Sequence, residues 1–142
     1  MIVTEPKEAI WAWANNRLKI PWSSDFVGFG VTQDSCLKAV VVYNGFTRRV
    51  CYTHVAIDDP KVITRTFVRA VLEYPFVQCD LKYVIGLVDE TNESALTLYR
   101  HLGAKELHRF PGAGVKDCDF LLLSLDRDDC KWIKGGNYGL RR

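Results

Sequence analysis

Between residues 46 and 88 the apolar residues of this chain change their spacing twice, and this change constrains the fold more than any other feature. The segment from Phe46 to Ile57 is rich in Val, Tyr, Phe and Thr, which is typical of a β-strand. After Asp58-Asp59-Pro60 the apolar side chains take helical spacing as far as Tyr74-Pro75. Lys82 to Val88 is then a mostly apolar run, as expected for a strand covered on both faces. A strand, a helix and a second strand in this order predict a right-handed crossover between two parallel strands.

The residues before this unit predict one helix and two further strands. Apolar residues recur at three- and four-residue intervals from Thr4 to Lys19, so we expect an amphipathic helix that Thr4 caps and Pro21 ends. Phe26 to Gln33 and Leu37 to Tyr43 read as strands. Because Asn and Gly both tolerate positive φ, Asn44-Gly45 predicts a tight hairpin into the strand at Phe46. The three strands should form an antiparallel meander.

The last part of the chain predicts a helix and two strands. Asn92 is placed to cap a helix with one apolar face, and Gly103 stands where a left-handed C-cap is needed. Lys105 to Phe110 and Asp117 to Leu125 read as strands. We therefore predict a single α/β (α+β) domain over residues 1–142, with a mixed central sheet, helices on both faces and the order α-β-β-β-α-β-α-β-β. Residues 131–142 are expected to be a flexible tail.

The charge of the chain argues against a nucleic-acid partner. The 19 basic and 17 acidic residues give a formal net charge of +2, and no stretch concentrates enough Lys or Arg to follow a phosphate backbone. The densest basic cluster is C-terminal and consists of Lys131, Lys134, Arg141 and Arg142. It could contact RNA or DNA, although a soluble tail is the commoner reading of such a cluster.

The cysteines and the hydropathy pattern indicate the cellular compartment. Five cysteines, odd in number, widely spaced and mostly set among apolar neighbours, are typical of buried side chains in a reducing environment. No C-x-x-C pair is present, and the three histidines lack metal-ligand spacing with the cysteines, so we expect no metal. The N-terminal segment lacks a signal-peptide pattern, and no apolar run reaches membrane-spanning length. We expect a cytoplasmic protein with no membrane partner.

The most specific motif lies in the last predicted helix. Residues 92–104 read Asn-Glu-Ser-Ala-Leu-Thr-Leu-Tyr-Arg-His-Leu-Gly-Ala. They resemble the Asn-x-x-Ala-x-x-Leu-Tyr-x-x-x-Gly-Phe signature of the GNAT superfamily of acetyl-CoA-dependent N-acetyltransferases, without its final Phe. The order of elements over about residues 26 to 125 is also similar to the GNAT order. Tyr74-Pro75-Phe76, followed by a strand and by Asn92, resembles in particular phage- and prophage-encoded GNAT-like proteins and, more distantly, protein N-terminal acetylases.

This resemblance implies a sheet whose two central parallel strands diverge, with acetyl-CoA wedged between them. In this chain they would be residues 46–57 and 82–88, and the backbone of Val55 and Ile57 would bind the pantetheine. The CoA pyrophosphate would lie at the start of the following helix, where unpaired N–H groups and the helix dipole favour an anion.

The loop that would bind the pyrophosphate departs from the family pattern. GNAT proteins have glycines where this chain has Val62 and Thr64, and a basic residue where it has Asp59. Lys61, Thr64 and Arg65 still offer two cations and a hydroxyl to the phosphates. Alternatively, Lys61 and Arg65 form only a solvated face at i, i+4.

The resemblance also implies catalytic roles. Tyr99 stands where the family's tyrosine protonates the departing thiolate, although its helix face is also the packing face. Asn92 would contact CoA, or serve as an N-cap alone. His54 shares a strand face with Tyr52 and is the candidate general base, whereas a lone strand histidine is more often structural. The strand glutamate that many GNAT enzymes use as a base is missing, so a water relay or no dedicated base are the alternatives.

The acceptor would bind between the N-terminal helix and the last hairpin. Trp22 and Phe26 could line an apolar slot there, unless they belong to the core, and Asp119 could attract a cationic amine. We therefore expect direct transfer of an acetyl group from acetyl-CoA to a primary amine, either a small molecule or a protein N-terminus or lysine, with a homodimer as one option for assembly. The alternative hypothesis is a GNAT-like fold without catalysis that serves as a structural or partner-binding protein, for example of a phage.

Overall fold

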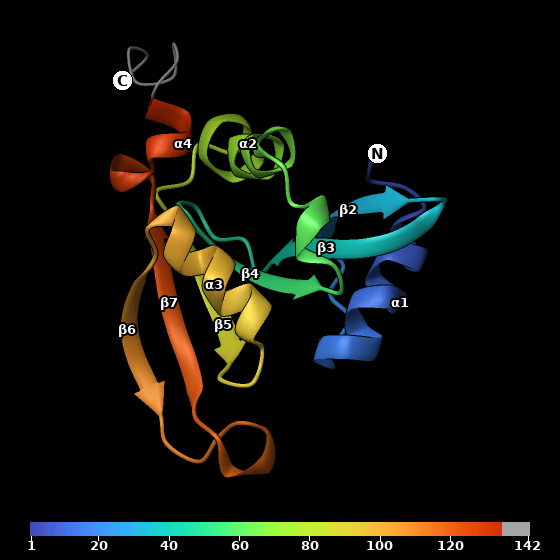
Figure 1. Ribbon diagram of the computed structural model, residues 1–142. Coiled ribbons are helices and arrows are strands. Elements are labelled where there is room, and N and C mark those ends of the chain that lie inside the picture. Colours follow the sequence, from blue (N-terminus) through green and yellow to red (C-terminus); the bar gives the residue numbers. More distant parts are fainter. Residues whose placement is uncertain (135–142) are drawn as a thin grey trace.

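A computed structural model of the protein describes residues 1–134, apart from the side chain of Lys134. One mixed sheet of seven strands runs through it in the order β1-β2-β3-β4-β5-β7-β6 (Figure 1). The strands are β1 (Ile2–Val3), β2 (Val27–Gln33), β3 (Cys36–Asn44), β4 (Val50–Ile57), β5 (Tyr83–Asp89), β6 (Lys105–Phe110) and β7 (Phe120–Asp126). The α-helices are α1 (Lys7–Leu18), α2 (Arg65–Glu73), α3 (Glu93–Leu102) and α4 (Lys131–Lys134). This arrangement confirms the predicted α+β class and element order, to which it adds β1, α4 and a few single helical turns.

Two apolar clusters lie on opposite faces of the sheet. On one face Ile10 of α1 packs with Val40 and Val42 of β3. Their neighbours Val41 and Tyr43 belong to a second cluster, together with the buried side chains of α2 and α3. Successive residues of a strand point to opposite faces of the sheet. Because the two clusters use alternate residues of β3, α1 lies on one face and α2 and α3 lie on the other. Helices therefore cover both faces of this part of the sheet, as predicted.

The strand β5 has only one buried face. Val84 and Val88 are each 2% exposed and join the cluster under α3, whereas Tyr83 is 42% exposed. Leu87, which shares the face of Tyr83, lines an open cleft. The prediction that this run is covered on both faces is wrong, because a cleft lies where a second helix was expected.

One of the two turns of the meander differs from the prediction. The tight two-residue turn is Asp34-Ser35, where φ is positive at both residues, 53° and 65°. Asn44 still belongs to β3, and β4 begins at Val50 rather than at Phe46. The expected hairpin at Asn44-Gly45 is therefore a longer loop. Only glycine is well suited to the positive φ of 62° at Gly45, so the Asn-Gly signal identified a turn but not its length.

The first helix starts and stops at different residues from those expected. Ile2 and Val3 pair with β2, and α1 begins after Pro6 without a side-chain cap, so the prediction of Thr4 as N-cap is wrong. At the other end the left-handed conformation of Lys19, with φ of 56°, ends the helix before Pro21.

The later helices are capped by side chains. Pro60–Val62 form a single 3-10 turn, and α2 begins after Thr64, whose hydroxyl accepts a hydrogen bond from the N–H of Phe67 at 3.2 Å. The helix therefore starts later than the expected Val62. Asn92 caps α3 with its side chain, and Gly103 ends it with φ of 92°, as predicted.

The C-terminal segment begins with ordered structure. Residues 131–134 form α4, and Ile133 is 1% exposed within the cluster under α2 and α3. The flexible tail expected from residue 131 therefore does not begin there. Residues 135–142, which include the basic Arg141 and Arg142, lie outside the described residues.

Candidate active site

The parallel strands β4 and β5 pair at one end only. Residues 50–53 pair in register with residues 83–86, and the pairing stops at Thr53 and Gly86, although the strands continue to Ile57 and Asp89. In Figure 1 the two arrows point away from each other beyond this point. This divergence, which we call the fork, is the feature that the GNAT resemblance implied.

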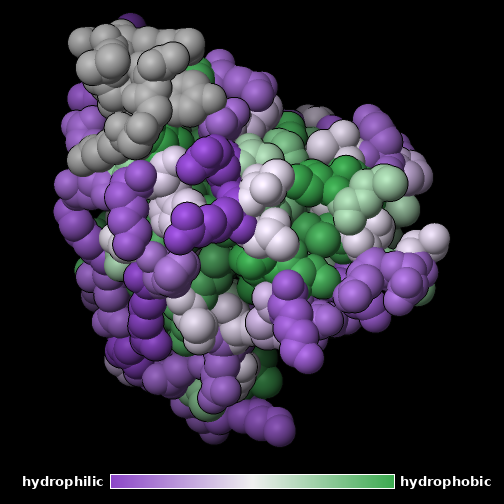
Figure 2. Space-filling view, turned by 45° about the horizontal axis from the view of Figure 1, so that its top comes forward, coloured by the Kyte–Doolittle hydropathy of each residue, from purple (hydrophilic) through white to green (hydrophobic). Residues whose placement is uncertain are grey.

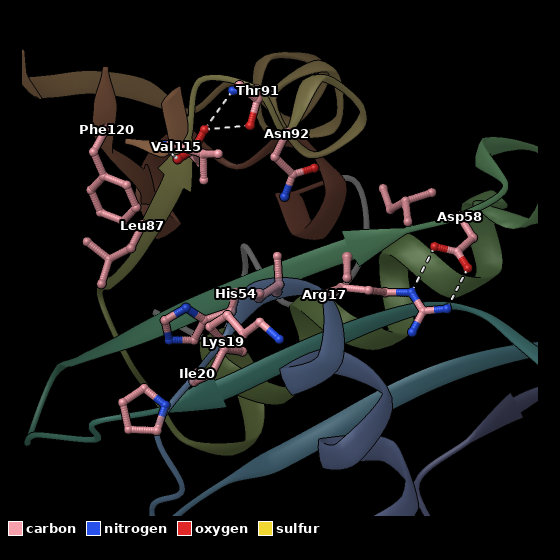
Figure 3. Close-up of a pocket in the computed structure, with 15 residues that line it drawn as sticks. Arg17, Lys19, Ile20, His54, Asp58, Leu87, Thr91, Asn92, Val115 and Phe120 are labelled. Carbon is pink, nitrogen blue, oxygen red and sulfur yellow. Dashed lines mark hydrogen bonds and ion pairs between the residues drawn. The ribbon is translucent and has the colours of Figure 1, made fainter. Parts of the chain in front are cut away.

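A cleft of about 610 Å³ opens beside the fork (Figure 3). Its walls come from the C-terminal end of α1, from β4 and β5, and from the segments that precede α3 and β7. The polar side chains that line it include Arg17, Lys19, His54, Asp58, Asp89 and Asn92.

Side chains of α3 and its cap bind the free edge of β4. The Tyr99 hydroxyl donates to the carbonyl of Thr53 at 3.4 Å, and the Asn92 Nδ2 donates to the carbonyl of Val55 at 3.0 Å. The Ser94 hydroxyl donates to the carbonyl of Ile57 at 3.3 Å. Because residues two apart on a strand point their backbone groups to the same side, these three carbonyls lie along one edge of β4, from which β5 departs after Thr53. The carbonyls are satisfied there without a strand partner.

Tyr99 lies at the base of the fork. Its side chain is 3% exposed, and its hydroxyl reaches the last paired residue of β4. Burial raises the pKa of Tyr99 well above its ordinary value of 10.0, while the hydrogen bond to Thr53 opposes part of this rise. The phenol is therefore fully protonated at neutral pH and donates a hydrogen bond.

Gly86 makes room for this tyrosine. A Cβ atom at Gly86 would lie 2.8 Å from Tyr99 Cζ and 2.9 Å from its Cε1, which is closer than real Cβ contacts occur. The sequence analysis missed Gly86, although a lone glycine inside an otherwise apolar strand is the known signal for such a close approach.

His54 lines the cleft on the opposite face of β4. Its Nε2 lies 3.2 Å from the Oδ1 of Asn44, whose Nδ2 donates to the Ser23 hydroxyl at 3.3 Å. An amide oxygen only accepts hydrogen bonds, so Nε2 carries the proton and Nδ1 keeps a free lone pair. Burial lowers the pKa of His54 to about 4, and the imidazole is therefore neutral at physiological pH. Tyr52, on the same face, is 43% exposed and its ring packs near Gly45 rather than in the cleft.

A second hollow, of about 560 Å³, lies between α2, α3 and α4. Its lining combines apolar side chains with the basic Arg65, Arg69, His101 and Lys131. Figure 2 shows hydrophobic side chains gathered in the middle of the molecular face that is brought forward there, with hydrophilic side chains around them. Of these basic residues, the sequence analysis had named only Arg65 for the phosphates. Arg69 follows Arg65 by one helical turn, so its position could have been inferred from the same pattern.

The predicted phosphate loop divides between two places. Lys61 and Val62 line a separate shallow hollow beside the N-terminal residues, and Thr64 borders both hollows. Lys61 precedes the helix that begins at Arg65, so these two residues do not form an i, i+4 pair on one helix. The nearby acidic groups have partners: Asp58 pairs with Arg17, and Asp59 accepts a hydrogen bond from the N–H of Lys61.

The aromatic residues predicted for the acceptor site lie elsewhere. Phe26 is 1% exposed in the cluster under α1, and Trp22 is 49% exposed. The ammonium of Lys7 lies 5.8 Å from the Trp22 ring and 5.3 Å from the Phe26 ring. Neither ring lines the cleft, so the core alternative holds for Phe26 and the slot is not formed by these two side chains.

Asp119 is occupied by contacts within the fold. Its carboxylate accepts from Arg109 Nη1 at 3.2 Å and from the N–H of Gly112 at 3.3 Å. Arg109 also binds Glu90 and Glu106, so these contacts connect β6 to the segment after β5. The cleft is lined at this side by Val115 and Phe120 rather than by Asp119.

Within residues 1–134, no group of three or more His, Cys, Asp or Glu side chains could hold a metal ion. No helix in the same part of the chain is both long enough and apolar enough to cross a bilayer.

A mixed sheet with a fork between its central parallel strands, and a tyrosine-bearing helix across that fork, is the arrangement that the resemblance to GNAT N-acetyltransferases implied. No protein-family profile matches the sequence, and no curated protein matches it.

Solved structures do match. A variant of the spermidine N-acetyltransferase SpeG from Vibrio cholerae aligns with a TM-score of 0.73 at 15% identity, over 95% of this chain and 98% of that chain. The spermidine/spermine N-acetyltransferase SpeG from Vibrio cholerae in complex with manganese ions aligns with a TM-score of 0.69, also at 15% identity, over 99% and 95% of the two chains. At this identity the likeness shows the fold.

Proposed function

We propose that this protein transfers an acetyl group from acetyl-CoA directly to a primary amine. The observation that carries the proposal is the fork, with the protonated Tyr99 at its base on one face of β4 and the neutral His54 on the other. The structural neighbours, which are acetyltransferases acting on spermidine, support the same class of reaction.

The donor would bind on the side of α2 and α3. The carbonyls of Val55 and Ile57 are already bonded by Asn92 and Ser94, so this edge would offer N–H groups to the amide carbonyls of pantetheine. The phosphates would lie near Arg65 and the other basic side chains of the second hollow, where opposite charges attract. Thr64 and the N-terminus of α2 border the same hollow and favour an anion.

The acceptor would enter through the cleft on the other face. The amine nitrogen would attack the thioester carbon and form a C–N bond, and the C–S bond would break as the thiolate takes up a proton. Tyr99 would supply that proton, because its hydroxyl lies at the base of the fork and is fully protonated. The nitrogen would release one proton to water to give the neutral amide, and the proton donor would regain its proton from water.

His54 would orient the amine rather than act as a strong base. Its Nδ1 can accept a hydrogen bond from the neutral amine, but a pKa of about 4 makes it a weak proton acceptor at neutral pH. The amine would therefore lose its ammonium proton to water before attack, which is the water-relay alternative that the sequence left open.

The test combines acetyl-CoA titration by calorimetry with an acetylation assay on Tyr99→Phe. We expect micromolar binding in the wild type, turnover reduced about a hundredfold in the variant, and little change in affinity for acetyl-CoA. Tyr83→Phe is the matched control, because Tyr83 is 42% exposed at the paired end of β5.

Equal turnover in Tyr99→Phe would remove the tyrosine from the mechanism. Absence of acetyl-CoA binding in the wild type would contradict the proposal as a whole. It would favour the non-catalytic, partner-binding alternative, for which the missing glycines at Val62 and Thr64 are the motivating feature. The phage origin, the homodimer and the cytoplasmic location stay predictions from the sequence.

A further inference from the structure

The charged groups of the cleft are unequally engaged. Arg17 forms a two-point contact with Asp58, with Nε to Oδ1 at 2.9 Å and Nη2 to Oδ2 at 2.8 Å. Its remaining Nη1 donates to the carbonyl of Trp13 at 3.0 Å. This pair therefore leaves little hydrogen-bonding capacity for a ligand.

Asp89, the other carboxylate of the cleft, is also used within the fold. Its Oδ1 accepts from the N–H of Thr91 at 2.9 Å and from the Thr91 hydroxyl at 2.6 Å, and its Oδ2 accepts from the N–H of Val115 at 2.6 Å. These contacts hold the loop before β7 against the end of β5. A polycationic acceptor would therefore find Asp58 paired with a cation and both oxygens of Asp89 already accepting hydrogen bonds within the fold.

Lys19 differs from these groups. It lines the cleft together with His54, as Figure 3 shows, and among residues 1–134 its ammonium has no hydrogen-bond or ion-pair partner. Its backbone is left-handed, with φ of 56°, a conformation in which glycine or asparagine would cost less. The strained conformation places a cationic side chain where a smaller residue would end the helix equally well.

We infer that the acceptor is a small molecule that carries an anionic group, a carboxylate or a phosphate, close to its primary amine. Lys19 would bind the anion, while His54 Nδ1 accepts a hydrogen bond from the amine. This inference rests on the proposed acetyl transfer and names its acceptor class. It differs from the polyamine that the neighbours acetylate, since a polyamine offers Lys19 only like charge.

The experiment compares kcat/KM for four amines with acetyl-CoA: β-alanine, phosphoethanolamine, propylamine and spermidine. We expect the carboxylate or the phosphate compound to exceed propylamine and spermidine at least about tenfold, the factor that one hydrogen bond to a charged group supplies. The first two amines distinguish carboxylate from phosphate as the anion.

Variants of Lys19 test the residue itself. Lys19→Gln should remove the preference for the anionic amines, and Lys19→Glu should shift the preference toward spermidine. Lys19→Gly should raise the melting temperature and still lose the preference, which separates the stability of the fold from recognition of the acceptor. Lys82→Gln, an exposed lysine outside the cleft, is the matched control and should keep the preference.

The inference would be overturned if spermidine or propylamine were the best acceptor, or if Lys19→Gln kept the preference for anionic amines. Either result would still be compatible with acetyl transfer. If no amine is acetylated, the melting temperature of the CoA complex decides: a rise caused by the anionic amines alone supports the inference, and no rise overturns it. Failure of the proposed function is recognised separately, by the absence of acetyl-CoA binding.

Discussion

Acid should destabilise this fold through His54. Burial lowers the pKa of the folded-state imidazole from 6.5 to about 4. Between these pH values the histidine is therefore protonated in the unfolded chain but largely neutral in the folded protein. The free energy of unfolding therefore falls as the pH decreases from about 6.5 to about 4, and above this window the contribution is constant. The difference between the two pKa values lowers the free energy of unfolding by about 3 kcal/mol at pH 4. By about pH 5.2 the loss is already about 2 kcal/mol.

The measurement is urea-induced unfolding of the wild type and His54→Gln at several pH values from about 7.5 to about 4. Glutamine does not titrate, and its amide can donate to Asn44 as the imidazole does. The carboxylates that acid also protonates, Asp58 and Asp89 among them, contribute equally to both proteins, so their difference isolates the histidine. We expect the variant to gain about 3 kcal/mol relative to the wild type across this range. His108→Gln, at an exposed position, should follow the wild type.

A difference between wild type and His54→Gln that does not change with pH would refute this reasoning. It would mean that the imidazole titrates near its ordinary pKa in the folded protein. His54 would then be charged in part near neutrality and would return as a candidate general base.

Two further predictions concern the donor side. Gly86→Ala should lower the free energy of unfolding by about 1–3 kcal/mol and reduce turnover, because the new methyl group displaces the Tyr99 ring; chemical denaturation and the acetylation assay check this. Replacing Arg65 and Arg69 together by Ala should raise the dissociation constant for acetyl-CoA about tenfold in calorimetry, with turnover at saturation little changed. Lys61→Ala should leave that constant unchanged, and the opposite pattern would place the phosphates at the loop rather than in the hollow between the helices.

The fold could be predicted from the sequence where local signals decide it. The change from strand to helix to strand over residues 46–88 gave the parallel crossover, and Asn92 and Gly103 gave the ends of α3. Local signals failed where tertiary contacts compete with them. Asn44 belongs to β3 and its side chain contacts Ser23 and His54, so the loop between β3 and β4 is longer than the tight turn expected at Asn44-Gly45.

Parts of the site could be predicted from the motif and from the alternation of the strand. Tyr99 and Asn92, which belong to the motif, lie at the fork, and His54 of the strand lines the cleft, while their roles stay predictions. Lys19 could not have been found from the sequence, because its position at the cleft depends on a left-handed backbone and on the packing of α1 beside β4. The prediction that Trp22 lines the acceptor site failed because the spacing of aromatic residues indicates that they lie near one another. It does not indicate where the cleft lies.

The chemistry of the cysteines favours direct transfer over an acetyl-enzyme intermediate. Cys51 is the cysteine of β4, and it is 0% exposed in the cluster beneath α2 and α3. Burial raises the pKa of its thiol to about 12, so the thiolate needed to take an acetyl group is absent at neutral pH. Among the described residues no cysteine lines the cleft. An amine bound there would attack from the face of β4 that carries His54, while the proton for the departing thiolate would come from Tyr99 on the other face. In the proposed reaction the fork would give nucleophile and leaving group separate routes to the same carbonyl, so no acetyl-enzyme intermediate would be needed.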